Sequence, residues 1–177
     1  MRAMTMWVAA VALAWSATAS AVEVGGIRLD EKANVGGQEL VLNGAGVRTR
    51  VFIKVYVASL WLPAKANALP GVLAKGPRRV QMNRLRDLSA DQLVNALVDG
   101  LKDNNSAAEL ASVKAQVDQM VATMKAFNEV KEKDVVALDF VDGATKITLN
   151  GQAKTSIPGD AFNAALMKVW LGDKPVQ

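Results

Sequence analysis

The sequence predicts a single α+β domain built on a large, mainly antiparallel sheet. Apolar residues alternate at a period of two before residue 86 and again after residue 134, which indicates strands. Between these regions, and once more at the end of the chain, apolar residues recur at helical spacing. Glycine-containing turns separate successive strands, as in hairpins. Strands and helices that are grouped in this way are typical of the α+β class.

The first 21 residues have the pattern of an export signal. Arg2 supplies a positive end, residues 7–15 are apolar, and Ala19-Ser20-Ala21 is a small-residue cleavage site. The apolar stretch is too short to span a bilayer and no stop-transfer pattern follows, so we expect cleavage rather than a retained anchor. We therefore expect a domain of residues 22–177, periplasmic or secreted after cleavage near Ala21, with no membrane span in the mature protein.

The composition excludes several chemistries at once. The chain has no cysteine and no histidine, so it can form no thiol nucleophile, Ser-His triad, His or Cys metal site, or disulfide. We expect no metal and no cofactor. The formal net charge is only +4, and basic residues are interspersed with acidic ones, which argues against nucleic acid as a partner.

The first half of the domain predicts a series of strands. Two or three short strands are expected over residues 22–42, separated by Gly25-Gly26 and Gly36-Gly37. A glycine-bearing turn at residues 43–48 then leads to a twelve-residue strand at residues 51–62, expected to be the longest in the sheet. Both faces of this strand are largely apolar, which is typical of a central strand that is covered on each side.

Two helices are predicted in the middle of the chain. The prolines of residues 63–77 predict a loop or a weak helix, and a strand is expected at residues 80–85. Ser89 with Gln92, and Ser106 with Glu109, then form capping boxes that start the two helices.

The last third of the chain predicts a meander and a final helix. Strands are expected at residues 135–140, 146–149 and 152–157, with turns at Asp142-Gly143 and Asn150-Gly151. The final helix begins after Pro158 and ends at Gly172.

Three stretches of the chain resemble the chalcone isomerase-like family. They are LNGAGVR followed by FIKVYVASLWL, then RLRDLSADQLVNALVDGLKDNN, and finally PGDAFNAALMKVWLGDKP. Together they cover most of the mature chain, and their details resemble the bacterial secreted (periplasmic) branch more than the plant enzymes. The resemblance implies an open-faced β-sandwich of the chalcone isomerase type, with helices layered on one face of the sheet and a ligand cleft between the layers.

The resemblance also implies which catalytic groups are kept. In the plant isomerases an arginine steers the substrate phenolate, while a tyrosine, an asparagine and two threonines arrange water and hydrogen bonds. Arg48 matches the arginine and Tyr56 stands at a threonine, but Leu93 and Gly100 stand at the helix tyrosine and asparagine, and the second threonine falls near Asn163. Loss of one positioned hydrogen bond typically lowers the rate roughly a hundredfold or more, so two losses favour binding over catalysis.

The leading hypothesis is a non-catalytic periplasmic binding protein for a small amphipathic anion, such as a fatty acid. An arginine with a tyrosine at these positions resembles the fatty-acid-binding branch of the fold, in which the pair holds the carboxylate. Lys54 precedes Tyr56 on the same strand and is either a pocket residue or solvated. Leu93, Ala96 and Leu97 are expected to line the cleft, and Gly100 to leave room for the tail. The candidate ligand-binding residues are Arg48, Tyr56, Lys54, Leu93, Leu97, Gly100 and Asn163.

Two other functions stay open from the sequence. One is a residual chalcone isomerase-like lyase for a phenolic substrate, in which Arg48 stabilises the anion and Tyr56 or Lys54 transfers the proton. The other is an envelope accessory protein without a small ligand. Alternative anchors are Arg50, and Arg84 with Arg86 on one face of their strand. The loop at residues 63–77 either caps the cleft or lies elsewhere.

Overall fold

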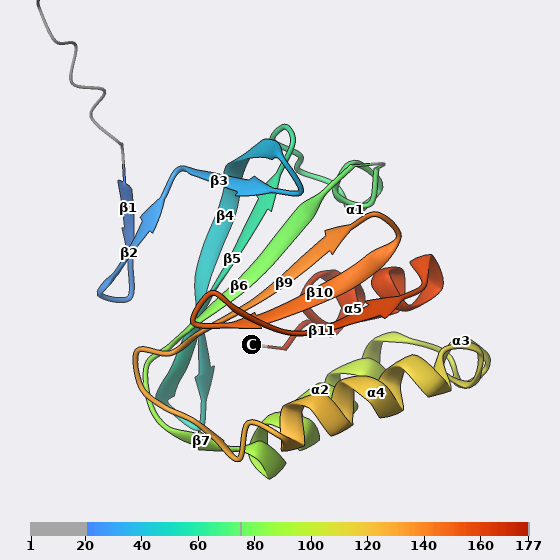
Figure 1. The fold of residues 1–177 in the computed structure, drawn as a ribbon. Helices are drawn as coiled ribbons and strands as arrows, with labels where there is room; N and C mark the ends of the chain where they lie inside the picture. The colour runs from blue at the N-terminus through green and yellow to red at the C-terminus, as the bar shows by residue number, and fades with distance from the viewer. Residues whose placement is uncertain (1–20, 75, 177) are drawn as a thin grey trace, which may run out of the picture.

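A seven-stranded antiparallel sheet forms the body of the molecule (Figure 1). The computed structural model describes residues 21–74 and 76–176, so the predicted export signal lies outside the described residues except for Ala21. Across the sheet the strands follow in the order β11 (Gln152–Pro158), β10 (Ala144–Leu149), β9 (Val135–Val141), β6 (Arg78–Arg84), β5 (Ile53–Leu62), β4 (Gln38–Arg50) and β3 (Lys32–Val35). The predicted α+β class is confirmed.

The remaining elements flank this sheet. Two short antiparallel pairs accompany it, and four of the five helices found in the described residues follow the sixth strand in sequence. The pairs are β1 (Ala21–Val24) with β2 (Ile27–Asp30), and β7 (Leu88–Ser89) with β8 (Glu129–Val130). The helices are α1 (Leu69–Val72), α2 (Ala90–Asn104), α3 (Ala107–Ser112), α4 (Lys114–Lys125) and α5 (Asp160–Leu171). No helix within the described part of the chain is long and apolar enough to cross a bilayer.

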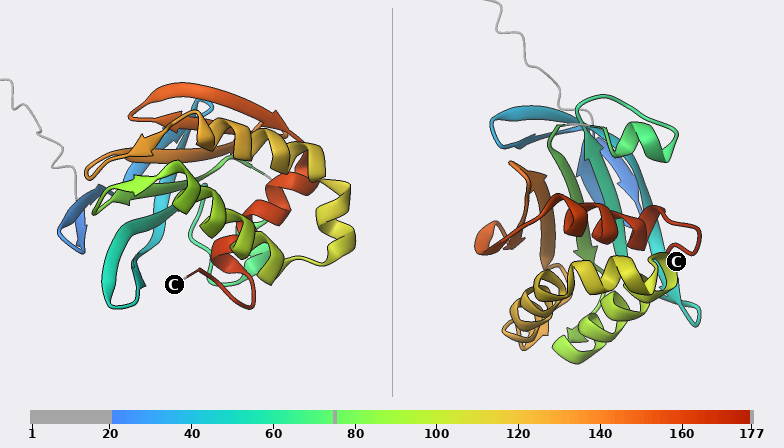
Figure 2. Two further views of the ribbon diagram at one scale, coloured as in Figure 1. Left: turned by 90° about the horizontal axis from the view of Figure 1, so that it is seen from below. Right: turned by 90° about the vertical axis from the view of Figure 1, so that its right-hand side faces the viewer.

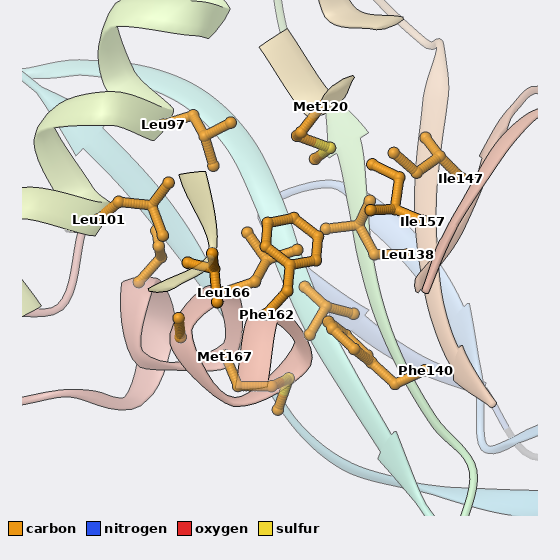
Figure 3. Close-up of a cluster of buried hydrophobic side chains, with 14 of the residues drawn as sticks. Leu97, Leu101, Met120, Leu138, Phe140, Ile147, Ile157, Phe162, Leu166 and Met167 are labelled. Carbon is orange, nitrogen blue, oxygen red and sulfur yellow. The ribbon is translucent and has the colours of Figure 1, made fainter. Parts of the chain in front are cut away.

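Helices α2, α4 and α5 lie together over one face of the sheet (Figure 2). Both predicted capping boxes are present: Ser89 accepts from the backbone of Gln92, and Ser106 from that of Glu109. The second helical stretch is interrupted at Val113, whose φ of −117° separates α3 from α4. The main core fills the space between the helices and the sheet, with the Phe162 ring of α5 at its centre (Figure 3).

A second, smaller core lies on the opposite face of the sheet. It consists of Leu29, Val35, Leu40, Leu42, Val57 and Trp61, and the β1–β2 hairpin contributes to it. The Trp61 indole donates to the backbone carbonyl of Asp30 at 3.2 Å, which ties this hairpin to β5. Strand β5 is therefore covered on both faces, as its two apolar faces predict.

The predicted turn at residues 43–48 is wrong. These residues belong to β4, which has 13 residues and is longer than the ten-residue β5. Gly44 and Gly46 do not have positive φ and lie in the extended backbone of β4. A Cβ on either residue would meet no atom within 4 Å, so neither position requires glycine. Pairing with β5 decides the local structure, because glycine permits a turn without requiring one.

Two β-bulges interrupt the pairing of β4 with β5. Asn43 has no pairing partner in β5 and Val55 has none in β4, so the register shifts after Leu42 and shifts back after Arg48. Each bulge places one extra residue in one strand and increases the local twist.

The hairpin between β4 and β5 turns at Val51 and Phe52. Both have positive φ, 46° and 63°, which asparagine and glycine adopt more readily. The left-handed conformation disfavours other L-residues by roughly 1–2 kcal/mol each. The turn is therefore strained, and neither side chain is buried.

Candidate functional site

Three side chains from adjacent strands stand side by side on the helix-covered face of the sheet. In the sheet register Arg48 of β4 pairs with Tyr56 of β5, and Tyr56 pairs with Arg84 of β6. Paired residues on antiparallel strands project from the same face, so the arginines lie on either side of Tyr56. Each guanidinium carbon is 5.5 Å from the centroid of the tyrosine ring.

The Tyr56 hydroxyl is held by neighbouring donors. The Trp170 indole of α5 donates to it at 3.2 Å, and Arg48 also hydrogen-bonds it. Burial raises the pKa of Tyr56 above its ordinary value, while the charge of Arg48, the Trp170 hydrogen bond and the charge of Arg84 oppose the rise. The phenol is therefore protonated at neutral pH. Because the hydroxyl oxygen already accepts hydrogen bonds from Trp170 and Arg48, the hydroxyl hydrogen is the part that can bind a ligand, by donating to one of its oxygens.

Arg84 is the most unusual member of this cluster. Its side chain is 1% exposed, and none of its three guanidinium nitrogens has a hydrogen-bond partner among the described residues. Burial lowers the pKa of Arg84 to about 10, so the group is still charged at neutral pH. Buried charges normally pair with another charge or a bound ion, so this one has the properties of an anion anchor.

Arg84 was only an alternative in the sequence prediction, although strand alternation could have singled it out. Val80 and Met82 are the apolar members of its strand and pack in the main core, and Arg84 follows them at a period of two. The prediction that Arg84 and Arg86 share a face is wrong: β6 ends at Arg84, and Arg86 is exposed.

An apolar cavity, called here the inner cavity, lies beside the cluster between the helices and the sheet. Besides Arg48, Tyr56 and Arg84, its walls include Met82, Leu93, Leu97, Met120, Met124 and Trp170. Its open volume is about 60 Å³, room for about two water molecules. Methionines are unbranched and readily repack, so the methionines in these walls provide a means of enlarging the cavity.

A larger and more open groove continues from the other side of the same residues. This outer groove has a volume of about 460 Å³ and is bounded by β4, β5 and the end of the chain, including Gly44, Gly46, Leu60 and Val176. Arg48, Tyr56, Trp170 and Val176 line both spaces. The cluster is therefore placed between an apolar cavity and an accessible groove of a size that is common for ligand sites.

The structure brings four of the predicted site residues together. Arg48, Tyr56, Leu93 and Leu97 all line the inner cavity, as does Ala96. Leu93 and Ala96 are half-buried in α2 because their side of the helix faces the cavity.

Three predicted site residues lie outside both spaces. Lys54 is exposed near the tip of the β4–β5 hairpin. Gly100 is buried, but Val169 and Val176 occupy the space beside it, 2.8 and 3.0 Å from the point that a Cβ would occupy, so it leaves no room for a tail. Asn163 is buried and accepts a 2.6 Å hydrogen bond from Thr145.

The loop at residues 63–77 does not cap the cluster. Its described residues contribute to neither the inner cavity nor the outer groove. Val72 of α1 packs into the main core instead, and the Ala66 amide donates to the Asn43 side chain at 2.7 Å. The alternative in which this loop lies elsewhere is confirmed.

A curled antiparallel sheet with helices on one face and a cavity between them defines a class of α+β proteins. The family model described as chalcone isomerase-like matches residues 21–177, and the chain belongs to this family. A solved structure of a fatty-acid binding protein from Arabidopsis thaliana is similar, with a TM-score of 0.69 and 10% sequence identity, over 89% of this chain and 92% of that one. A comparison with curated proteins finds no match. The predicted family and fold are confirmed.

Proposed function

We propose that the protein is a non-catalytic binding protein for a small amphipathic anion, such as a fatty acid. The headgroup lies among Arg48, Tyr56 and Arg84, where the guanidinium groups pair with the anion and the phenol donates a hydrogen bond. The apolar chain occupies the inner cavity, after Met120 and Met124 move aside.

The buried Arg84 is the observation that carries this proposal. A guanidinium that is 1% exposed and lacks a hydrogen-bond partner among the described residues carries a large desolvation penalty. Arg48 adds a second positive charge on the other side of Tyr56. An anion at this position offsets the penalty, and the apolar walls next to it fit a ligand that is amphipathic.

The protonation state of Tyr56 favours binding over isomerisation. A general acid or base works best when its pKa is close to the operating pH. Burial moves the pKa of Tyr56 upward, away from neutrality. Lys54, the other proton-transfer candidate, is exposed and does not line the inner cavity. The name of the similar Arabidopsis thaliana protein, a fatty-acid binding protein, supports the same choice.

Titration with tetradecanoate tests the proposal. We expect saturable binding to the wild-type chain, and Arg48→Ala to weaken it by about 10–100-fold, because a hydrogen bond to a charged group contributes about 1.5–3 kcal/mol. Isothermal titration calorimetry below the micelle concentration measures both constants. Arg28→Ala is the control, because Arg28 is exposed in β2, outside both spaces. Absence of binding to the wild type, or equal binding by Arg48→Ala, contradicts the proposal.

We also propose that the protein acts after export, as a periplasmic or secreted member of the bacterial branch of its family. The support is the charged, apolar and small-residue pattern of residues 1–21. The intact mass of the protein recovered from the envelope of its own cells is expected to match a chain that begins near residue 22. A mass equal to that of the full 177-residue chain would contradict export with cleavage.

A further inference from the structure

The tip of the β4–β5 hairpin exposes three consecutive apolar residues. Val51, Phe52 and Ile53 are 78%, 98% and 48% exposed, and they are three of the four large apolar residues that the structure shows as exposed. Single exposed apolar residues are common, but a contiguous group marks an interaction surface. The hairpin projects beyond the rest of the sheet, as the teal loop in Figure 2 shows.

The turn chemistry at this tip differs from that of the other hairpins. Four other hairpins also turn through two residues of positive φ, and each has glycine in the second position. Their turns are Gly25-Gly26, Gly36-Gly37, Asp142-Gly143 and Asn150-Gly151. Within the described chain, the β4–β5 turn alone places a β-branched residue and an aromatic residue in this geometry. Because both side chains are exposed, packing within the chain does not compensate the strain, which points to a role outside the fold.

Positive charges surround the apolar tip. Arg50 and Lys54 flank it in sequence and are exposed. A groove of about 430 Å³ beside the tip is lined by Arg48, Arg50, Val51, Ile53 and Arg86, and by one acidic residue, Asp87. Basic residues around exposed apolar side chains complement the surface of an anionic bilayer.

We propose that this tip docks the protein on an anionic lipid bilayer. Val51, Phe52 and Ile53 enter the boundary between headgroups and acyl chains, while Arg50 and Lys54 contact the headgroups. Val51 and Phe52 form a two-residue turn and Ile53 begins the next strand, so the three side chains lie on a narrow protruding tip rather than on a flat face. A fluid bilayer can surround such a tip on every side. The inference does not depend on the proposed ligand, but Arg48 lines the groove beside the tip, so docking brings the candidate site close to the lipid surface.

Vesicle sedimentation with the chain starting at Ala21 tests the proposal. Every described element lies within residues 21–176, and this start keeps the apolar N-terminal segment out of the measurement. The wild type is expected to bind vesicles of phosphatidylcholine with about 30% phosphatidylglycerol better than vesicles of phosphatidylcholine alone, and to lose binding as salt rises. The double substitution Val51→Asn with Phe52→Gly is expected to lower the partition coefficient at least about tenfold.

This double substitution also separates docking from folding. Asn-Gly suits the observed turn, so the thermal midpoint should equal or exceed that of the wild type. Val22→Asn is the matched control, because Val22 is the fourth exposed apolar residue and lies away from the tip, in β1. Equal vesicle binding by the wild type and the double variant overturns the proposal. Failure of the wild type to bind either vesicle also overturns it and leaves a protein as the partner of the tip.

A fluorescent residue at the tip gives a second measurement. Phe52→Trp is expected to show quenching by lipids with brominated acyl chains, beyond the quenching that the parent chain shows from Trp61 and Trp170. Quenching no greater than that of the parent chain places the tip outside the bilayer and contradicts insertion.

Discussion

Replacing Arg84 by methionine is expected to stabilise the fold by up to about 3.5 kcal/mol while weakening tetradecanoate binding at least about tenfold. The stabilisation follows from the pKa of Arg84, which burial lowers from 12.5 to about 10; each pKa unit corresponds to about 1.4 kcal/mol. Methionine keeps an unbranched apolar chain and removes the buried charge. The loss of affinity follows from the loss of a charged hydrogen-bond donor to the anion.

The pH dependence gives this prediction a definite sign. Because the pKa of Arg84 is lower in the folded than in the unfolded state, the charge destabilises the fold at every pH below about 10. Between about pH 10 and the pKa of Arg84 in the unfolded chain, the unfolded chain binds more protons than the folded one. The free energy of unfolding of the wild type therefore rises with pH relative to that of Arg84→Met. Denaturant unfolding at pH 7 and at about pH 10.5 should therefore show a smaller difference at the higher pH.

Arg86→Met is the control for Arg84→Met. Arg86 lies two residues further along and is exposed, so its replacement is expected to change stability by no more than about 0.5 kcal/mol. If Arg84→Met is less stable than the wild type, the guanidinium contributes to the fold itself, and its assignment as an anion anchor fails. Unchanged affinity in Arg84→Met would exclude a contact between Arg84 and the headgroup.

Phe162→Ala is expected to destabilise the protein by about 3–5 kcal/mol, whereas Phe52→Ala changes stability by no more than about 0.5 kcal/mol. The Phe162 side chain is 0% exposed and lies among Leu138, Ile157 and Leu166 in the main core (Figure 3). Its removal leaves a cavity between α5 and the sheet. Phe52 is 98% exposed, so the same substitution there removes few contacts.

Thermal and denaturant unfolding of the two alanine variants measure this difference. For a chain of this length each kcal/mol shifts the midpoint by about 2–4 °C, so Phe162→Ala should unfold roughly 10 °C below the wild type. A loss of less than about 1 kcal/mol for Phe162→Ala would show that α5 is not held by this ring. A comparable loss for Phe52→Ala would show that the tip is packed in solution.

Local sequence signals predicted much of the fold. The capping boxes at Ser89 and Ser106 and the Asn150-Gly151 turn depend on neighbouring residues only, so they can be read directly from the sequence. The path of residues 43–52 could not be predicted in this way. There the pairing of β4 with β5 overrides the glycines, and the turn uses Val51 and Phe52, whose side chains normally disfavour it.

The prediction of the candidate site was right for Arg48, Tyr56, Leu93 and Leu97, which line the inner cavity, and wrong for Lys54, Gly100 and Asn163, which do not. Arg48 and Tyr56 meet as expected because they share a face of the sheet. Gly100 and Asn163 were assigned from helix resemblance, and the rotation and depth of a helix depend on its tertiary neighbours, here Val169 and Val176 for Gly100. The lack of any partner for Arg84 among the described residues is visible only once the elements are assembled.

The bulge at Asn43 determines which side of the sheet presents Arg48. Before this residue β4 pairs Leu42 with Trp61; continued without the bulge, that register would set Arg48 opposite Val55 and turn it away from the helices. The extra residue reverses the face to which the following side chains point, so Arg48 pairs with Tyr56. The unpaired Val55 restores the original register before the tip, where Thr49 pairs with Lys54. One unpaired residue on each strand, Asn43 and Val55, thus decides whether Arg48 and Arg84 meet at the Tyr56 phenol or lie on opposite surfaces of the sheet.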